Sequence, residues 1–441
     1  MTSSMDRRKF LTVAGGTSAA LLFVSGCSTT GGSSGTGVTA APKQMTYAYW
    51  GSALVDTNIH NVATAYKAKF PDTTLIPQNT PWATFWTKLA TQVAAGTGPN
   101  GIQMSNQMIM EYANRGALLD FEPFVGSTIK LDTWDVNLKT YGVINGKRVG
   151  VPISTDAFTA LYNWDFMNTA GITVPPKGWN WQQLADIAVE AAKAGGTGKW
   201  GMSDGSDNYE VLEGWMRGLG KSWFTDANTA HPSLGFDTTD FGDFLNYWDK
   251  GRKNGSVVPG DVSSQDILGE PTSALVKGLA PIAFTTTSEL EPYRALVKDK
   301  LQPAPLPDQA QGGTKHANFV RPNLFISGLK TTPYAEATAE LVNFWINDPG
   351  AVKAMAFSQG VPPTPASAAL LDQTEPAGLL SAPQYLALVR EIGSPMDSLT
   401  PKGGRDVYSL LTTTAQNVQF NRQTISAAVD SFFKQAPTLL A

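Results

Sequence analysis

The chain has 441 residues and a formal net charge of −4, with 42% hydrophobic and 16% charged residues. This length exceeds what one hydrophobic core usually supports, so we expect two domains. A mildly acidic chain with no basic tract argues against nucleic acid or anionic lipid as a partner.

The N-terminus has the features of an export signal. Arg7 and Arg8 precede an apolar run over residues 11–24 that is too short and too rich in glycine to span a bilayer. Residues 1–26 therefore read as a twin-arginine signal peptide. The stretch Val24-Ser25-Gly26-Cys27 resembles a lipobox, in which the cysteine receives a diacylglyceryl group. Cys27 is the only cysteine, which excludes disulfides, thiolate metal sites and a cysteine nucleophile.

Residues 27–43 are expected to form the lipidated cysteine and a flexible tether. Residues 28–42 are Ser, Thr, Gly, Val, Ala and Pro, which carry no charge and offer little that can pack. We expect the mature protein to be exported and held at the outer face of the cell membrane through Cys27.

The first folded region alternates strands and helices. The predicted strands cover residues 44–50, 73–77 and 101–106, and the predicted helices cover residues 56–70, 82–95 and 109–115. Such alternation is typical of a mostly parallel sheet covered on both faces.

Ligands of open sheets bind outside the carboxyl ends of the strands. In this region those positions hold Trp50, Gly51 and Ser52 after the first strand, Trp82 after the second, and Asn106 and Gln107 after the third. They are the candidate binding residues of the first lobe.

A crossing between two lobes is predicted at Ser154-Thr155-Asp156. This polar break divides two β-rich runs within residues 149–164, after a turn at Asn145-Gly146. A strand over residues 318–327 should return beside it, and a last passage should occur near Pro365. The expected N-terminal lobe is residues 44–155 with 321–365, and the C-terminal lobe is residues 156–320 with 366–441.

The second region is richer in helices. Predicted helices cover residues 164–170, 181–194, 210–219, 241–253, 266–278, 335–347, 351–357, 383–392 and 407–434. Predicted strands cover residues 200–202 and 279–284, and the Pro-, Gln- and Gly-rich run 301–313 reads as a loop.

Several segments together resemble the extracellular solute-binding proteins of family 1, the carbohydrate-type receptors of ABC importers. The matching segments include Phe70-Pro71-Asp72, Gly96-Thr97-Gly98-Pro99, Asn114-Arg115-Gly116, Gly150-Val151-Pro152, Tyr162-Asn163-Trp164-Asp165, Trp179-Asn180-Trp181 and Asp348-Pro349. The resemblance implies an α/β, two-lobed periplasmic-binding-protein-like fold, each lobe a mostly parallel sheet flanked by helices, with a hinge of crossing segments. It also implies a carbohydrate ligand, ABC permease subunits as partners, a monomer, and no catalysis, cofactor or metal.

Two departures from the family pattern concern the site. Asn100 stands where members commonly have Asp. Thr286-Thr287-Ser288 stands where they often have Gly-Ser-Trp, which removes a stacking aromatic. Trp215 or Trp223 is a candidate to replace it.

A sugar site needs flat aromatic rings for C–H faces and planar polar groups for hydroxyls. Trp50 and Trp82 are the expected stacking residues, and Asp156 is the expected hydroxyl acceptor at the hinge. Further candidates are Asn106, Gln107, Trp215, Thr285, Thr286, Thr287, Arg321 and Asn323.

Each candidate also has a purely structural interpretation. Asp156 suits a turn or helix cap, Arg321 a surface ion pair, and Trp215 a core position. The segment Asp204-Gly205-Ser206-Asp207-Asn208 resembles part of a calcium loop but lacks the distant bidentate Glu, which favours a plain turn. The three histidines are isolated, which leaves no zinc or triad pattern.

The leading hypothesis is a receptor whose two lobes close over a sugar or oligosaccharide. A secreted glycoside hydrolase remains an alternative, with Asp156 and one of Glu210, Glu213 or Glu289 as its carboxyl pair. The same fold binding a peptide, a polyamine or an anion is a third.

Overall fold

The computed structural model describes residues 42–134, 136–229, 231–266, 269–309, 317–371, 378–396 and 398–441. The predicted signal peptide, Cys27 and nearly all of the tether lie outside these ranges. No helix in the described ranges is both long and apolar enough to cross a membrane.

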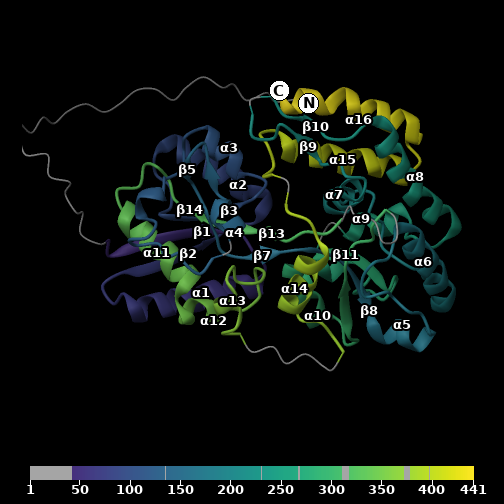
Figure 1. The fold of residues 1–441 in the computed structure, drawn as a ribbon, viewed down its shortest axis with the longest axis horizontal. Coiled ribbons are helices and arrows are strands. Elements are labelled where there is room, and N and C mark those ends of the chain that lie inside the picture. The colour runs from purple at the N-terminus through teal and green to yellow at the C-terminus, as the bar shows by residue number, and fades with distance from the viewer. Residues whose placement is uncertain are drawn as a thin grey trace, which may run out of the picture. The chain divides into compact units, whose positions relative to one another are not determined.

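The N-terminal lobe is built on a five-stranded sheet in the order β2-β1-β3-β14-β6 (Figure 1). The strands are β1 (Gln44–Tyr49), β2 (Thr74–Asn79), β3 (Gly101–Ser105), β6 (Val151–Pro152) and β14 (Leu324–Ser327). β1 runs parallel to β2 and β3, whereas β14 runs antiparallel to β3 and β6. The expected parallel core is present, and the returning strand makes the sheet mixed.

Two cores cover the two faces of this sheet, because alternate residues of a strand point to opposite sides. Met45, Tyr47 and Tyr49 pack in one core, while Ala48 packs in the other. The first core is shared with α1 (Ala53–Lys69) and α11 (Ala335–Asn347), and the second with α2 (Trp82–Ala95) and α3 (Ile109–Asn114). α12 (Pro349–Met355) packs along α1. Trp345, expected in the core, is 4% exposed.

The sheet of the C-terminal lobe is antiparallel, so the expectation of a mostly parallel sheet is wrong for this lobe. Its order is β11 (Ile282–Thr286), β8 (Phe158–Asn163), β12 (Leu301–Ala304). β11 and β12, joined through α10 (Leu290–Leu296), both run antiparallel to β8. The sequence does alternate strand, helix and strand from β11 through α10 to β12. In the sheet, however, β8, which comes earlier in the chain, lies between β11 and β12.

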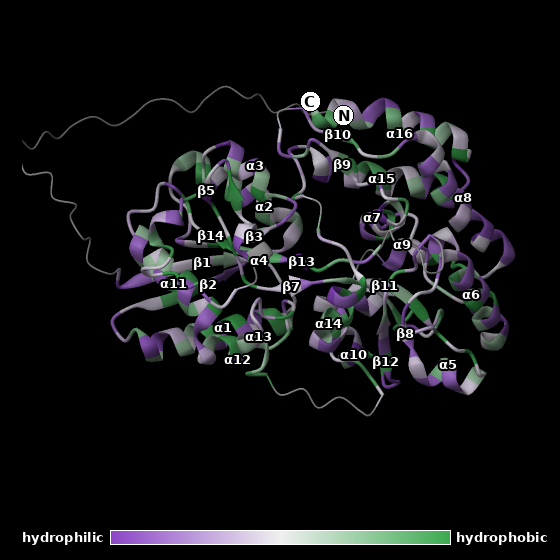
Figure 2. Ribbon diagram, viewed as in Figure 1, coloured by the Kyte–Doolittle hydropathy of each residue, from purple (hydrophilic) through white to green (hydrophobic). Residues whose placement is uncertain are grey.

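Helices make up most of the C-terminal lobe. They are α5 (Trp164–Ala170), α6 (Trp181–Gly195), α7 (Tyr209–Gly218), α8 (Thr238–Asn254), α9 (Gly260–Asp266), α14 (Ala382–Ile392), α15 (Gly404–Gln419) and α16 (Ile425–Leu440). Hydrophobic and hydrophilic residues alternate along α6, α8 and α16, as expected for helices with one buried face (Figure 2). Trp248 on α8 is fully buried in their shared core.

Four local predictions are wrong. Residues 266–278 are not one helix, because α9 ends at Asp266 and Pro271 lies in a short 3-10 helix (Glu270–Thr272). The predicted loop at 301–313 begins with strand β12, where Pro303 is tolerated because the strand is at an edge. Residues 200–202 form only an isolated bridge at Met202. The predicted helix 407–434 is two helices, α15 and α16, separated at Asn421, whose φ is 54°.

The predicted hinge pairing is confirmed. β7 (Thr155–Asp156) pairs antiparallel with β13 (Arg321–Pro322), and Thr155 also forms a bridge with Val361. The boundary expected at residue 365 stays a prediction, because α13 (Pro365–Ala368) contacts both lobes. Its Ser367 hydroxyl donates to the Ile346 carbonyl (3.3 Å), and its Ala368 packs against the hydrophobic cluster that contains Leu161 of β8. Residues 372–377, which follow, are outside the described ranges.

Replacing Trp248 by Ala should lower the free energy of unfolding by about 3–5 kcal/mol, because it leaves a cavity in the core of the C-terminal lobe. Urea unfolding followed by far-UV circular dichroism measures the change. Val189→Ala on α6, 45% exposed, is the control and should change it by less than about 0.5 kcal/mol. Equal losses in the two variants would contradict this view of the core.

Candidate functional site

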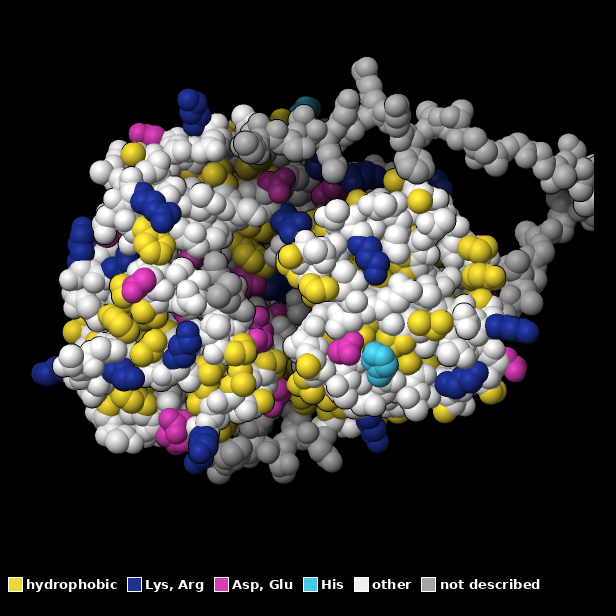
Figure 3. Space-filling model, turned by 180° about the vertical axis from the view of Figure 1, so that it is seen from behind, with side chains coloured by type: hydrophobic (Ala, Val, Ile, Leu, Met, Phe, Trp, Pro, Cys, Tyr) yellow, Lys and Arg dark blue, Asp and Glu magenta, His cyan; other side chains and the backbone are white. Residues whose placement is uncertain are grey.

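A cavity of about 340 Å³ lies at the carboxyl ends of β1 and β3 and beside the hinge strands β7 and β13. Figure 3 shows a cleft in this part of the molecule with acidic side chains gathered along one wall. Most of the expected site residues line the cavity: Trp50, Gly51, Ser52, Trp82, Asn106, Gln107, Asp156, Thr286, Arg321 and Asn323. They come from both lobes and from the crossing between them.

Trp50 and Trp82 form an aromatic wall of the cavity. Their rings meet edge to face, with centroids 4.8 Å apart and planes at 68°. Behind them Phe85 and Trp86 are buried and hold the two rings in place. Trp50 and Trp82 themselves stay partly exposed, which leaves aromatic surface for a ligand.

Two glutamines missed by the sequence analysis organise the base of the cavity. The Gln103 amide donates to the Trp50 carbonyl (3.1 Å), and the Gln359 amide donates to the Gln103 side-chain oxygen (2.6 Å). Gln103 is a polar residue in the middle of the buried strand β3, and that position was the available signal. Such an amide chain fixes the direction in which each group donates or accepts.

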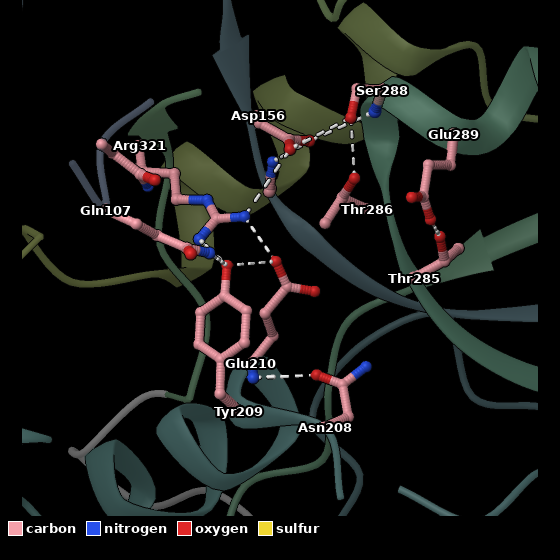
Figure 4. Close-up of polar contacts among 12 residues, drawn as sticks. Gln107, Asp156, Asn208, Tyr209, Glu210, Thr285, Thr286, Ser288, Glu289 and Arg321 are labelled. Carbon is pink, nitrogen blue, oxygen red and sulfur yellow. Dashed lines mark hydrogen bonds and ion pairs between the residues drawn. The ribbon is translucent and has the colours of Figure 1, made fainter. Parts of the chain in front are cut away.

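Asp156 is completely buried and its carboxylate is already bound by protein donors (Figure 4). One oxygen accepts from the Ala157 N–H (2.9 Å), the Thr287 hydroxyl (2.5 Å) and the Ser288 N–H (3.2 Å). The other accepts from the Ser288 hydroxyl (3.3 Å). The structure therefore gives Asp156 a positioning role, which corrects the expectation that it offers a free acceptor to the ligand.

Arg321 lies on the opposite hinge strand and is 5% exposed. Its guanidinium carbon sits 4.2 Å from the centroid of the Phe158 ring. One terminal nitrogen is 2.6 Å from a Glu210 carboxylate oxygen and 3.8 Å from an Asp156 oxygen. Arg321 is thus a buried cation neutralised by two carboxylates, and the surface ion pair considered from the sequence is wrong.

Tyr209, which the sequence analysis did not select, faces the cavity from the C-terminal lobe. Its hydroxyl accepts from the Gln107 amide (3.0 Å) and donates to Glu210 (2.9 Å), as Figure 4 shows. Its ring stacks on Tyr408, with centroids 4.3 Å apart. Burial, followed by the charge of Glu210, raises the pKa of the Tyr209 hydroxyl well above its usual value, so it remains protonated and can donate. Its sequence signal was its place directly after the helix cap Asn208.

The remaining candidates do not face this cavity. Trp215 is 7% exposed and packs against Trp181 in the core, and Trp223 is 3% exposed. Neither replaces the missing aromatic near Ser288, because the helical spacing of α7 turns Trp215 toward α6 and α8. Thr287 is engaged with Asp156, and the Thr285 hydroxyl donates to Glu289 beside a second cavity.

The replacement Glu210→Ala should destabilise the protein by on the order of 3 kcal/mol, because it leaves the buried Arg321 guanidinium without its closest carboxylate. Glu391→Ala, which removes an exposed partner of Lys177, is the control and should cost less than about 1 kcal/mol. Thermal unfolding of both variants measures the loss of stability. A Glu210→Ala protein as stable as the unaltered protein would contradict the assignment of the ion pair.

The family model for bacterial extracellular solute-binding proteins matches residues 52–352. A family 1 extracellular solute-binding protein from Alicyclobacillus acidocaldarius is 26% identical, with a TM-score of 0.68, over 90% of this chain and 98% of that one. A periplasmic oligogalacturonide-binding protein from Yersinia enterocolitica, in complex with saturated digalacturonic acid, is 19% identical with a TM-score of 0.77, over 90% of this chain and 98% of that one. At 19% identity, the similarity to the Yersinia protein shows a shared fold.

Among curated proteins, a stretch of 183 residues is 29% identical to a Brucella abortus protein described only as a proposed binding protein. The match covers 41% of this chain and 44% of that relative's length. The family model, in contrast, extends over more than half of the chain and includes both hinge strands. The protein therefore belongs to the family of bacterial extracellular solute-binding proteins.

Proposed function

We propose that this protein is the substrate-binding lipoprotein of an ABC importer, which captures a sugar or oligosaccharide between two lobes and delivers it to a membrane permease. The observation that carries the proposal is the pair of partly exposed rings of Trp50 and Trp82 in a cavity whose other lining side chains include amides, hydroxyls, four carboxyl groups and one guanidinium. Indole faces suit the C–H surface of a sugar ring, and amides suit its hydroxyl edge.

Ligand capture would use groups from both lobes. Asn106 and Gln107 follow strand β3 of the N-terminal lobe, while Tyr209 begins α7 of the C-terminal lobe. The Gln107–Tyr209 hydrogen bond joins the two sides directly. A ligand that contacts both lobes binds the closed state more tightly than the open state, so it shifts the protein toward the closed state. The permease would recognise that closed state.

The lining chemistry weighs against an anionic ligand and against hydrolysis. Arg321 is the one cation among the described residues that line the cavity, and Glu210 and Asp156 already neutralise it. Arg405 lies over the Trp82 ring, 5.3 Å from its centroid, but four carboxyl groups face the cavity, so its lining disfavours an anion. A glycosidase needs a protonated acid and an opposed carboxylate. Asp156 already accepts hydrogen bonds from protein donors and Glu210 is paired with Arg321, so neither carboxyl group is free for such a role.

The Yersinia protein of the same fold, which is in complex with digalacturonic acid, supports a carbohydrate ligand for this chain.

Calorimetric titration of the purified protein against mono- and oligosaccharides should give heat with at least one sugar. Trp82→Ala should weaken that binding about 10-fold, because it removes one stacking face. Trp164→Ala, a partly buried Trp on α5 away from the cavity, is the matched control and should retain affinity. A response to a peptide or an ion with no response to any sugar would refute the carbohydrate assignment.

Lipid anchoring is proposed from residues outside the described structure. Cys27→Ser should abolish incorporation of labelled palmitate and move the protein from the membrane fraction to the soluble fraction, since the thioether that carries the diacylglyceryl group cannot form. Ser28→Ala is the control and should stay with the membrane. A Cys27→Ser protein that remains membrane-bound would contradict the proposal.

A further inference from the structure

A second cavity of about 310 Å³ adjoins the first within the C-terminal lobe. The two cavities share four lining residues: Tyr209, Glu210, Glu270 and Glu289. The second extends from these residues past Thr285 and Tyr293 to the turn that carries Asp204 and Asp207. A ligand seated against Trp50 and Trp82 therefore has a neighbouring space bounded by the same side chains.

The second cavity is strongly acidic. Six carboxyl groups line it: Asp204, Asp207, Glu210, Asp266, Glu270 and Glu289. Two of them are neutralised from outside, Asp204 by Arg252 and Glu210 by Arg321. Among the described residues that line the cavity, none is Lys or Arg. The other four carboxyl groups form no salt bridge within the described residues, and Lys277 is the cation that acts on one of them, Asp266.

One carboxylate oxygen among these acids has no donor. Asp207 is 8% exposed, and although Gln419 and the Asp207 backbone N–H lie close to its carboxyl group, its Oδ2 atom is buried without a donor in the described structure. A buried carboxylate oxygen with no donor costs more than a typical missing hydrogen bond. Such a cost is expected where a ligand supplies the donor. Two observations therefore point to a ligand in this cavity: the unpaired Asp207 Oδ2 atom and the cluster of carboxyl groups around it.

The protonation of the cavity responds to a bound cation. Burial, then the charges of Asp204 and Asp266, raises the pKa of Asp207 to about 7, although Arg252 neutralises Asp204. Reduced hydration and the charge of Glu210 act to raise the pKa of Glu289, but this side chain is exposed, so water screens the effect and Asp207 is the group that matters. Near neutral pH Asp207 is partly protonated, and an entering cation displaces that proton.

We propose that this second cavity receives a protonated amine carried by the ligand, while the hydroxylated part of the same ligand lies against Trp50 and Trp82. The inference rests on the proposed sugar-binding function and narrows it to an amine-bearing saccharide. The cavity volume suits an organic group, and Phe284 and Tyr293 give it apolar and aromatic walls for a C–H framework. A bare metal ion fits less well, because the described residues contain no cluster of three or more His, Cys, Asp or Glu able to hold one.

The test compares a glucosamine disaccharide, whose amines are free, with N,N′-diacetylchitobiose, which has the same rings but neutral amides. Calorimetry at pH 7 should give at least 10-fold tighter binding of the free-amine sugar. Asp207→Asn, which keeps the shape and removes the charge, should abolish that preference and leave affinity for the acetylated sugar unchanged. Equal or tighter binding of the acetylated sugar by the unaltered protein would overturn the inference while the sugar-binding function stands.

A second measurement separates the cavity from the sugar site. Spermidine should raise the thermal unfolding midpoint of the protein and have no such effect on Asp207→Asn, with Glu391→Gln as the remote control. If spermidine acts in this way but no sugar binds, the acidic cavity is supported and the sugar-binding function is refuted. A larger, Asp207-dependent stabilisation by Ca²⁺ than by spermidine would overturn the assignment to an organic amine.

The pH dependence gives a further readout. An acid whose pKa is raised on folding destabilises the protein as pH increases from its ordinary pKa toward the raised value. Asp207→Asn should therefore be more stable than the unaltered protein at pH 8, with a smaller difference at pH 5. The affinity of the unaltered protein for spermidine, whose alkyl amines stay protonated over this range, should rise between pH 6 and pH 7.5. A spermidine affinity that is flat with pH, together with no gain in stability at pH 8, would overturn the role of Asp207.

Discussion

The arrangement of the site depends on the hydrogen bonds and the ion pair that the carboxylate of Asp156 makes. It accepts hydrogen bonds from the Thr287–Ser288 corner of the C-terminal lobe and lies close to Arg321 on the paired hinge strand. Breaking either contact would remove one of the few groups that stabilise a buried charge. The wall of the cavity at the hinge is therefore preorganised, and a ligand meets side chains already held in position.

The two neighbouring cavities differ in charge. Around the first, Gln359 binds Gln103 and Asp156 pairs with Arg321, while Gln359 Oε1 and Arg321 Nε have no hydrogen-bond partner among the described residues. In the second, Asp207 Oδ2 has no donor and several carboxyl groups face the same space without a lysine or arginine in the lining. The first cavity suits a neutral polyol, and the second favours a ligand group that carries positive charge. Selectivity among related sugars would follow from that preference, because a wrong ligand leaves the acids unpaired.

The sequence was sufficient for the class of fold, most helices and the hinge pairing, because these depend on local periodicity and on strand ends. It failed where distant segments decide the outcome. β8 inserts between β11 and β12, which no local pattern reveals, and Trp215 turns into the core because of its neighbours on α6 and α8. Trp50 and Trp82 were found because strand ends mark them. Tyr209 and Gln103 were missed, since a helix start and a buried strand are usual places for structural residues.

Pro303 on the edge strand β12 has a counterpart at each end of the other sheet, in Pro77 on β2 and Pro152 on β6. Proline has no N–H to offer, so it interrupts the row of donors along which a second chain would add a strand. Three of the four edge strands of these two sheets are therefore poor templates for an added strand, which disfavours edge-to-edge association of one copy of the chain with another.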